Sequence, residues 1–169
     1  MTKFVKFAAV AAAVLASTPA FAGTPVGVAV GSEPVATARI IKPLKLSATG
    51  ALNFGTIVMN GVTANRTVTL NADTTITCAT ELVCDLNGTV PTYNVQGTNN
   101  QVVTIIKTPT TLTGSNGGSL TLTPVGQANI TLTSSGSPGN NFPIGGAITI
   151  ASATVDGVYS GTVNVTVDY

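Results

Sequence analysis

The side chains that could carry acid–base or metal chemistry are few in this sequence. Of its 169 residues, 6 are Asp or Glu, 2 are Cys and none is His. The usual general base at neutral pH and the commonest metal ligand are therefore both missing, which leaves carboxylates as the main candidates. Two carboxylates about 5 to 9.5 Å apart in a cleft could cleave a glycosidic bond. The candidates are Asp73, Glu81, Asp85, Asp156 and Asp168.

The spacing of these carboxylates does not favour such a pair. No two of them fall on one predicted face with a third polar group beside them, so we interpret them as solvated charges of loops and strand edges. We expect no enzymatic activity and no catalytic, metal-binding or cofactor-binding residues. A structure that placed two of these carboxylates in one cleft would reopen the question.

The two cysteines are six positions apart, at Cys78 and Cys84. A redox pair would want the closer Cys-x-x-Cys spacing, and a metal site would need further ligands that the chain lacks. We therefore expect a structural disulfide that pins a strand connection. Closing a ring of about seven residues is worth roughly 2.4 kcal/mol by the loop-entropy estimate.

The first 22 residues have the pattern of a secretory signal peptide. Lys3 and Lys6 form a basic start, an apolar stretch covers residues 7–16, and Ala20 and Ala22 supply small residues at the cleavage subsites. The apolar stretch is short for a membrane anchor, which needs about 20 residues. We expect cleavage before Gly23 and export to a compartment where disulfides persist.

The overall charge is close to neutral. The chain has 7 Lys and Arg against 6 Asp and Glu, and removing Lys3 and Lys6 leaves 5 against 6, a balance of −1. Without a basic excess, no nucleic-acid partner is expected. Charged residues make up only 8% of the chain, and such weak self-repulsion among strand-forming residues favours association.

The composition and the turn spacing predict antiparallel strands. The chain has 29 Thr and 21 Val, whose β-branched side chains suit strands better than helices. Turn residues recur every 8 to 12 positions, which is typical of a sandwich or a barrel. The expected strands are residues 35–41, 44–48, 52–59, 66–70, 74–78, 89–95, 102–107, 119–125, 129–133, 147–151 and 159–169.

Three Gly-, Asn- and Ser-rich stretches separate these strands. Residues 114–118 and 134–141 are interpreted as surface loops, because Gly and Asn tolerate positive φ. Residues 97–100, between two apolar runs, are interpreted as a hairpin loop.

Residues 23–34 differ from the rest and form a candidate N-terminal arm. In an extended strand Val26, Val28 and Val30 would share one face, with small residues on the other. Such a strand could bury three valines in a groove of a neighbouring subunit, each worth about 1.5 kcal/mol or more, while its backbone completes a sheet edge. It could equally be a first strand paired within its own domain, or a loose leader.

Four stretches together resemble a family of short secreted bacterial domains that is catalogued as a domain of unknown function and is similar to fimbrial subunits. These stretches are residues 36–44 (ATARIIKPL), 52–57 (LNFGTI), 145–150 (GGAITI) and 157–169 (GVYSGTVNVTVDY). The family is similar to pilins of alternative chaperone–usher systems, whose incomplete immunoglobulin-like sandwich is completed by the N-terminal strand of the next subunit. The resemblance implies no catalytic or cofactor residues.

The resemblance leads us to expect an exported, all-β, immunoglobulin-like antiparallel sandwich over residues 35–169, possibly completed by a donor strand. Leu52 and Phe54 are candidate core residues. Val163, Val165 and Val167 share an inward face of the last strand with Tyr169. In the similar pilins, exported chaperones commonly bind the terminal strand; a capped sandwich edge would explain a terminal aromatic residue equally well.

The function expected on these grounds is that of a structural subunit of a bacterial surface fibre or pilus, which assembles by strand donation. The partners would be further copies or other fibre subunits, with a possible periplasmic chaperone and outer-membrane usher. The protein would pass through the periplasm to the cell surface or an extracellular fibre. The alternative is a secreted carbohydrate- or surface-binding adhesin module, although few aromatic side chains are available for a sugar platform.

Overall fold

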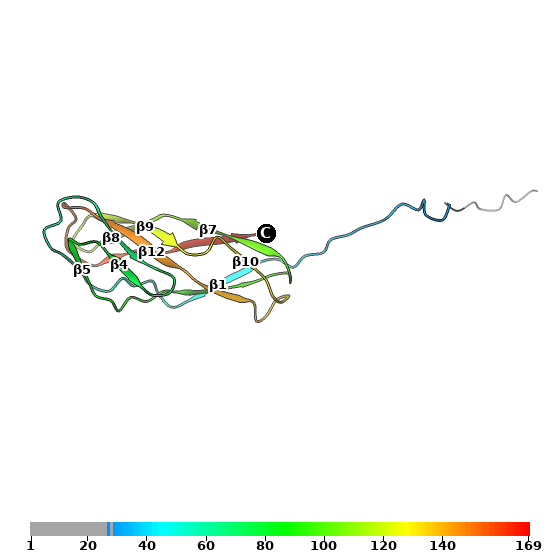
Figure 1. Ribbon diagram of the computed structural model, residues 1–169, viewed down its shortest axis with the longest axis horizontal. Coiled ribbons are helices and arrows are strands. Elements are labelled where there is room, and N and C mark those ends of the chain that lie inside the picture. Colours follow the sequence, from blue (N-terminus) through cyan, green and yellow to red (C-terminus); the bar gives the residue numbers. More distant parts are fainter. Residues whose placement is uncertain (1–26, 28) are drawn as a thin grey trace, which may run out of the picture. The chain divides into compact units, whose positions relative to one another are not determined.

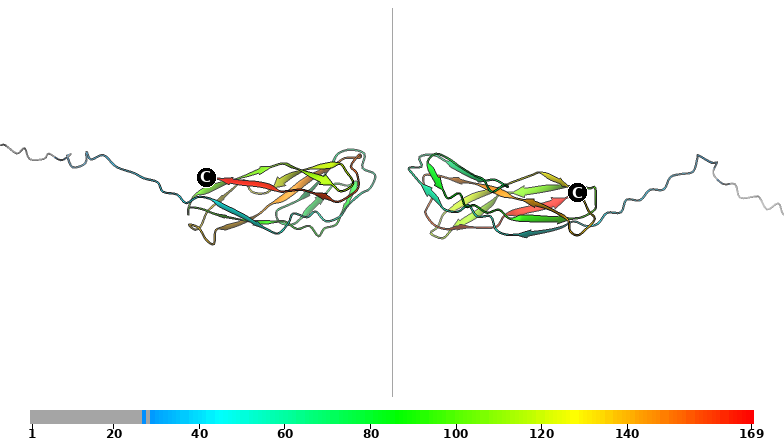
Figure 2. Two further views of the ribbon diagram at one scale, coloured as in Figure 1. Left: turned by 180° about the vertical axis from the view of Figure 1, so that it is seen from behind. Right: turned by 60° about the horizontal axis from the view of Figure 1, so that its bottom comes forward.

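The computed structural model describes residue 27 and residues 29–169, and these contain strands, turns and no helix (Figures 1 and 2). The chain divides into two units, Met1–Ala38 and Arg39–Tyr169, and each is described by itself. The expected all-β class is confirmed for the described residues, every paired strand of which is antiparallel to its neighbours. Nowhere in that part of the chain is there a helix that could span a membrane.

All fourteen strands of the described residues lie in the second unit. They are β1 (Lys45–Thr49), β2 (Ile57–Met59), β3 (Arg66–Leu70), β4 (Ile76–Cys78), β5 (Leu82–Cys84), β6 (Thr92–Gln96), β7 (Val102–Thr108), β8 (Thr110–Gly114), β9 (Ser119–Val125), β10 (Asn129–Thr131), β11 (Asn140–Pro143), β12 (Gly145–Ile150), β13 (Tyr159–Ser160) and β14 (Asn164–Asp168).

The strands form four hydrogen-bonded sheets that together make a sandwich. The largest has the order β13-β8-β9-β12-β3-β4, and a small sheet pairs β2 with β5. Two three-stranded sheets have the orders β1-β6-β11 and β10-β7-β14. Figure 1 shows β5 at one end of this unit, and β1, β10 and the chain's last residue at the other.

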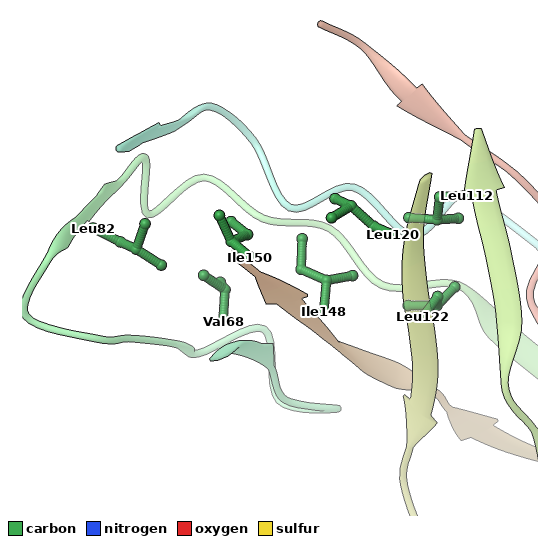
Figure 3. Packing of buried hydrophobic residues seen from close by; sticks show 7 residues of the cluster. All are labelled: Val68, Leu82, Leu112, Leu120, Leu122, Ile148 and Ile150. Atoms are coloured by element: carbon green, nitrogen blue, oxygen red, sulfur yellow. The ribbon is translucent and has the colours of Figure 1, made fainter. Parts of the chain in front are cut away.

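The sandwich has two apolar clusters, which define two halves. The closed half is built on Tyr93, Val95, Val103, Ile105, Leu132, Phe142 and Ile144. Its strands come from both three-stranded sheets, and the rings of Tyr93 and Phe142 stack at 5.6 Å. The groove half is built on Val68, Leu82, Leu112, Leu120, Leu122, Ile148 and Ile150. Figure 3 shows these seven side chains in a row from Leu82 to Leu112.

Strand alternation explains both clusters. In β9, Leu120 and Leu122 are buried, whereas Thr121 and Thr123 are exposed. In β7, Val103 and Ile105 are buried between exposed neighbours. Since successive side chains of a strand point to opposite faces, the Thr-rich pattern produces one apolar face and one polar face.

The prediction of a strand over residues 35–41 is wrong. This stretch is irregular, and Val35 and Ile40 are 87% and 91% exposed. A strand needs a neighbour for its backbone hydrogen bonds, and no strand pairs with this stretch in the part of the chain that the structure describes.

The hairpin expected at residues 97–100 is also wrong. The flanking strands β6 and β7 belong to different three-stranded sheets, so this loop crosses from one layer of the sandwich to the other. The apolar runs on both sides of residues 97–100 predict two strands. They do not predict that these two strands pair with each other.

Three strands were missed: β5, β8 and β11. Strand β8 follows β7 after the single residue Pro109, which removes a backbone donor and marks the change from one sheet to another. Strand β11 begins inside the stretch 134–141 that was interpreted as a loop. The predicted last strand, residues 159–169, is divided because β13 pairs with β8 whereas β14 pairs with β7.

Candidate functional site: an apolar groove

A groove of about 760 Å³ opens onto the apolar cluster of the groove half. Its floor consists of side chains from three strands of the six-stranded sheet: Leu112, Leu120, Leu122, Ile148 and Ile150. One wall is the segment 52–59, and the other is formed by residues 154–161 together with Val163. The groove is therefore a place where the core of the sandwich is incompletely covered.

Both walls end in sheet edges. The first wall is hydrogen-bonded on one side to the segment 82–89, through the β2–β5 pairing and through a bridge between Asn53 and Thr89. In the second wall, β13 pairs with β8 alone among the strands of the described residues, and it lies at the edge of the six-stranded sheet. Each wall therefore has a free edge on which a further strand could form backbone hydrogen bonds.

Leu52 and Phe54 lie in the first wall and pack over a glycine of β12. Both are half-buried against the apolar cluster. A Cβ at Gly146 would lie 2.9 Å from Cδ2 of Leu52 and 3.3 Å from the ring of Phe54. The absent side chain at Gly146 lets these two residues approach the sheet.

Gly55 interrupts the strand that was expected over residues 52–59. Its φ of +70° is unfavourable for other residues, and a Cβ there would lie 3.2 Å from the carbonyl oxygen of Asp85. Only residues 57–59 of the expected strand form a ladder, whereas Asn53 makes an isolated bridge. This wall is therefore a short, irregular cover over the core.

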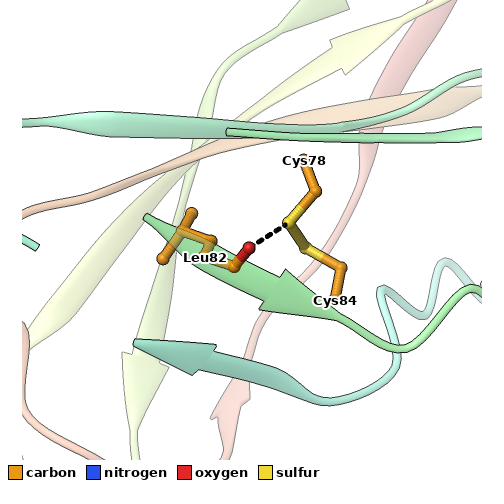
Figure 4. Close-up of a disulfide and its surroundings, with 3 residues drawn as sticks. All are labelled: Cys78, Leu82 and Cys84. Carbon is orange, nitrogen blue, oxygen red and sulfur yellow. Dashed lines mark hydrogen bonds between the residues drawn. A yellow bond between two sulfur atoms is a disulfide. The ribbon is translucent and has the colours of Figure 1, made fainter. Parts of the chain in front are cut away.

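The expected disulfide between Cys78 and Cys84 is confirmed, with Cα atoms 6.2 Å apart (Figure 4). It joins β4, an edge strand of the six-stranded sheet, to β5 of the small sheet. The carbonyl oxygen of Leu82 lies 3.4 Å from the Sγ of Cys78; because a disulfide sulfur has no hydrogen, we treat this as a close polar contact. The bond fastens the cover of the groove half to the large sheet.

The opposite end of the sandwich is closed by the last residue. The hydroxyl of Tyr169 donates to the carbonyl of Lys42 (2.5 Å) and accepts from the backbone N–H of Thr98 (2.8 Å). Lys42 also donates its backbone N–H to the Oγ1 of Thr98 at 2.6 Å. We call these three residues the clasp. It holds the start of the sandwich, the 96–101 loop and the last strand together.

The three valines of the last strand divide between the halves. Val165 and Val167 are half-buried against the closed half, and Val163 packs against both clusters and lines the groove. Tyr169 is 37% exposed and lies in the clasp.

The proposed donor strand lies largely outside the described residues, which include Val30 but neither Val26 nor Val28. Val30 is 98% exposed and lies in a turn that is closed by a hydrogen bond from the N–H of Ser32 to the carbonyl of Ala29 (2.8 Å). The chain therefore turns at residues 30 and 31, and an extended strand over residues 26–30 stays a prediction.

The carboxylates of the second unit are spread over the surface. Glu81 forms an ion pair with Arg66, and this hydrogen bond, with a second from the N–H of Thr63, lowers the pKa of Glu81. Hydrogen bonds from Thr75 lower the pKa of Asp73. Asp156 is the one acidic residue that lines the groove. Among the described residues, no three His, Cys, Asp or Glu side chains are grouped as a metal site.

The arrangement suits binding more than reaction. The floor of the groove is aliphatic, its walls are irregular strands with free edges, and it is long enough to be lined by three strands of one sheet. Its chemistry matches an extended apolar segment, whose side chains would enter the groove while its backbone pairs with a wall. Sequence reasoning identified Leu52, Phe54 and Val163 but missed the floor, because alternation alone does not tell a covered strand from an uncovered one.

Searches of curated proteins and of solved structures gave no match. The pattern of one family, described as "Domain of unknown function (DUF4402)", matches residues 44–169. This match covers the sandwich and three of the four stretches that carried the resemblance; of the stretch 36–44 it includes only Leu44. The chain belongs to the DUF4402 family.

Proposed function

We propose that this protein is an exported structural subunit of a bacterial surface fibre, and that it assembles when one copy inserts residues 26–30 into the groove of another. The observation that carries the proposal is the groove itself, a hollow of about 760 Å³ over aliphatic core side chains and beside two sheet edges. The protein would then act by association and would carry out no catalysis.

The groove and the arm have complementary chemistry. The floor side chains Leu112, Leu120 and Ile150 are aliphatic, as are the three valines that an extended arm would present on one face. Burying each valine contributes about 1.5 kcal/mol or more. Backbone pairing with β2 or β13 would add hydrogen bonds that fix the register of the inserted strand.

The position of the inserted strand would complete the sandwich. It would lie between the wall that contains β2 and the wall that contains β13, and would so connect the small sheet to the edge of the six-stranded sheet. An immunoglobulin-like sandwich completed in this way agrees with the resemblance to pilins. A periplasmic chaperone that occupies the same groove before assembly, and an outer-membrane usher, belong to this proposal as partners.

The tyrosines favour a structural subunit over a sugar-binding module. Tyr93 is buried against Phe142, Tyr159 donates its hydroxyl to the carbonyl of Val155 (2.7 Å), and Tyr169 is held in the clasp. All three rings therefore have structural partners, whereas sugar platforms commonly present a free aromatic face.

The test is assembly of the purified exported chain with Val26, Val28 and Val30 changed to Ser. We expect the variant to keep the near-native circular dichroism and thermal unfolding of the monomer, because the described part of the arm makes no core contact. We expect it to lose concentration-dependent fibres in electron microscopy, because serine side chains gain little from burial in the groove.

The matched control changes Thr121, Thr123 and Thr149 to Ser, which alters three exposed residues on the outer face of the large sheet. This control should assemble normally. Fibres of unchanged length and yield from the arm variant would contradict the proposed function.

A further inference from the structure

We propose that the two ends of the sandwich attract each other electrostatically, so that the basic end of one copy docks at the acidic groove end of the next. This inference rests on the proposed function, and it names the surface that orients the two copies before the arm is inserted. The partner is a second copy of this chain.

The basic end is the end that carries the clasp. Lys42 and Lys45 line a hollow of about 320 Å³ with Gln96 and Gly136. Arg39 donates a hydrogen bond to Gln101 in the same loop region. The carboxylate near this end, Asp168, accepts a hydrogen bond from the backbone N–H of Tyr169. Among the side chains described at this end, three are cationic and one is a carboxylate, so the end carries a net positive charge.

The acidic end is the end of the sandwich that carries β5 and the groove (Figure 1). Asp156 lines the groove, and Asp85 packs against Gly55 in the first wall. The nearby Glu81 is neutralised by Arg66, with which it forms an ion pair. No Lys or Arg lines the groove, so Asp85 and Asp156 lack a paired cation among the described residues.

The length of the linker brings these ends together during assembly. Residues 31–38 separate Val30 from Arg39, so the two are nine positions apart and at most about 30 Å in a fully extended chain. If Val30 occupies the groove of the next copy, the basic end of the donor must lie within that reach of the groove. Salt screens charges that are farther apart than the Debye length, which is about 30 Å at 0.01 M salt and about 8 Å at 0.15 M. Charges within the reach of the linker therefore attract each other at low salt and are largely screened at 0.15 M.

Complementary ends have a defined consequence for assembly. Opposite charges raise the rate of encounter, whereas two like ends repel each other, so the fibre grows head to tail. Insertion of the valines is apolar and is not weakened by salt. The charges should therefore act on the rate of elongation more than on the stability of the finished fibre.

The experiment measures the elongation rate of the full exported chain by light scattering between 10 and 500 mM NaCl. We expect the wild-type rate to fall about tenfold over this range. The variant K42Q/K45Q should elongate about tenfold more slowly than wild type at 10 mM NaCl and at nearly the same rate at 500 mM. The clasp is kept in this variant because it uses only the backbone of Lys42.

The matched control is T67E/T121E, which makes the same change of net charge at two exposed positions of the large sheet. It should elongate at close to the wild-type rate. A second test combines K42E/K45E with D85N/D156K in one chain. The first pair of changes alone should slow elongation, and the combined chain should recover most of the rate because the polarity of its ends is reversed.

The outcomes separate the two proposals. Elongation that is independent of salt, equal slowing by K42Q/K45Q and T67E/T121E, or failure of the combined chain to recover would overturn the electrostatic docking and leave strand donation standing. Fibres that form without the three arm valines would instead overturn the proposed function, on which this inference rests.

Discussion

The closed half and the groove half of the sandwich bury the same kinds of side chain but differ in what covers them. Around Phe142, two three-stranded sheets face each other, and Phe142 is only 1% exposed. Around Leu120, a six-stranded sheet faces a two-stranded sheet and an irregular segment, and a groove of about 760 Å³ remains. In both halves, alternating side chains form one apolar sheet face. The halves differ in the sheet or segment that covers this face.

The two halves differ in how completely a second layer covers the first. The closed half has a buried apolar cluster and a hydrogen-bonded clasp, and we expect these to hold the fold together when the groove is empty. The groove half has a hollow over its aliphatic side chains and, among the described residues, strand edges without a neighbour, which the proposed function assigns to a partner strand. Under the proposed function, stability and association would belong to different ends of one sandwich.

The largest expected difference between the halves is in the cost of removing a core side chain. Phe142→Ala should lower the free energy of unfolding by about 3 to 5 kcal/mol, because it leaves a cavity between two sheets. Leu120→Ala should cost about 2 to 3 kcal/mol, near the lower end for a leucine, because the space it leaves opens into the groove and is not an enclosed cavity. Urea unfolding of both variants checks this order; equal or reversed costs would contradict the distinction between the halves.

The disulfide tests whether the cover of the groove half is fastened separately. Replacing Cys78 and Cys84 together by Ala should lower the free energy of unfolding by about 2.4 kcal/mol. Because the bond joins β4 to β5, amide hydrogen exchange should accelerate most in residues 76–84 and 57–59. Faster exchange in β6 or β11 to the same degree would mean that the halves are not independent.

At the end that carries the clasp, we expect a substitution to loosen the closed half and to leave the groove half unchanged. Tyr169→Phe leaves the N–H of Thr98 without its acceptor and the carbonyl of Lys42 without its donor, so we expect a loss of about 1 to 2 kcal/mol. Amide exchange should accelerate at residues 98 and 44–46 but not in the groove walls. Leaving the aromatic ring in place makes the change specific to the hydroxyl.

The smallest effect concerns the pH dependence of the groove half. Arg66 lowers the pKa of Glu81, so this carboxylate stabilises the fold above its unfolded-state pKa, and that contribution is lost as the pH falls through the lower folded-state pKa. The change belongs to the range below about pH 4.3. In Glu81→Gln, the drop in the urea midpoint between pH 7 and pH 3 should be smaller than in wild type; an unchanged drop would remove Glu81 as its source.

The sequence was sufficient for the fold class and for features that depend on local pattern. Thr–Leu alternation in residues 119–123 predicts a strand with one buried face, and two cysteines allow only one pairing within the chain. Both predictions hold because they rest on backbone geometry and on covalent chemistry, with little influence from distant residues.

Partner choice between strands could not be predicted in the same way. The loop 97–100 joins two sheets instead of a hairpin, and residues 35–41 form no strand despite their β-branched side chains. Pairing depends on which strand edges tertiary packing brings together. The local pattern of a single sequence does not predict this. A groove in the sandwich was expected, but its position was not, since it depends on β2 and β13 having no neighbour on one side among the described residues.

The most direct test of the account is photo-cross-linking from position 28 in fibres grown from an equal mixture of ¹⁴N- and ¹⁵N-labelled chains. A photoreactive side chain there should cross-link to peptides that contain Leu112, Leu120 or Ile150, and half of the cross-linked pairs should join a light chain to a heavy one. Cross-links confined to single chains would show that the arm folds onto its own domain. Cross-links that avoid the groove would contradict strand donation altogether.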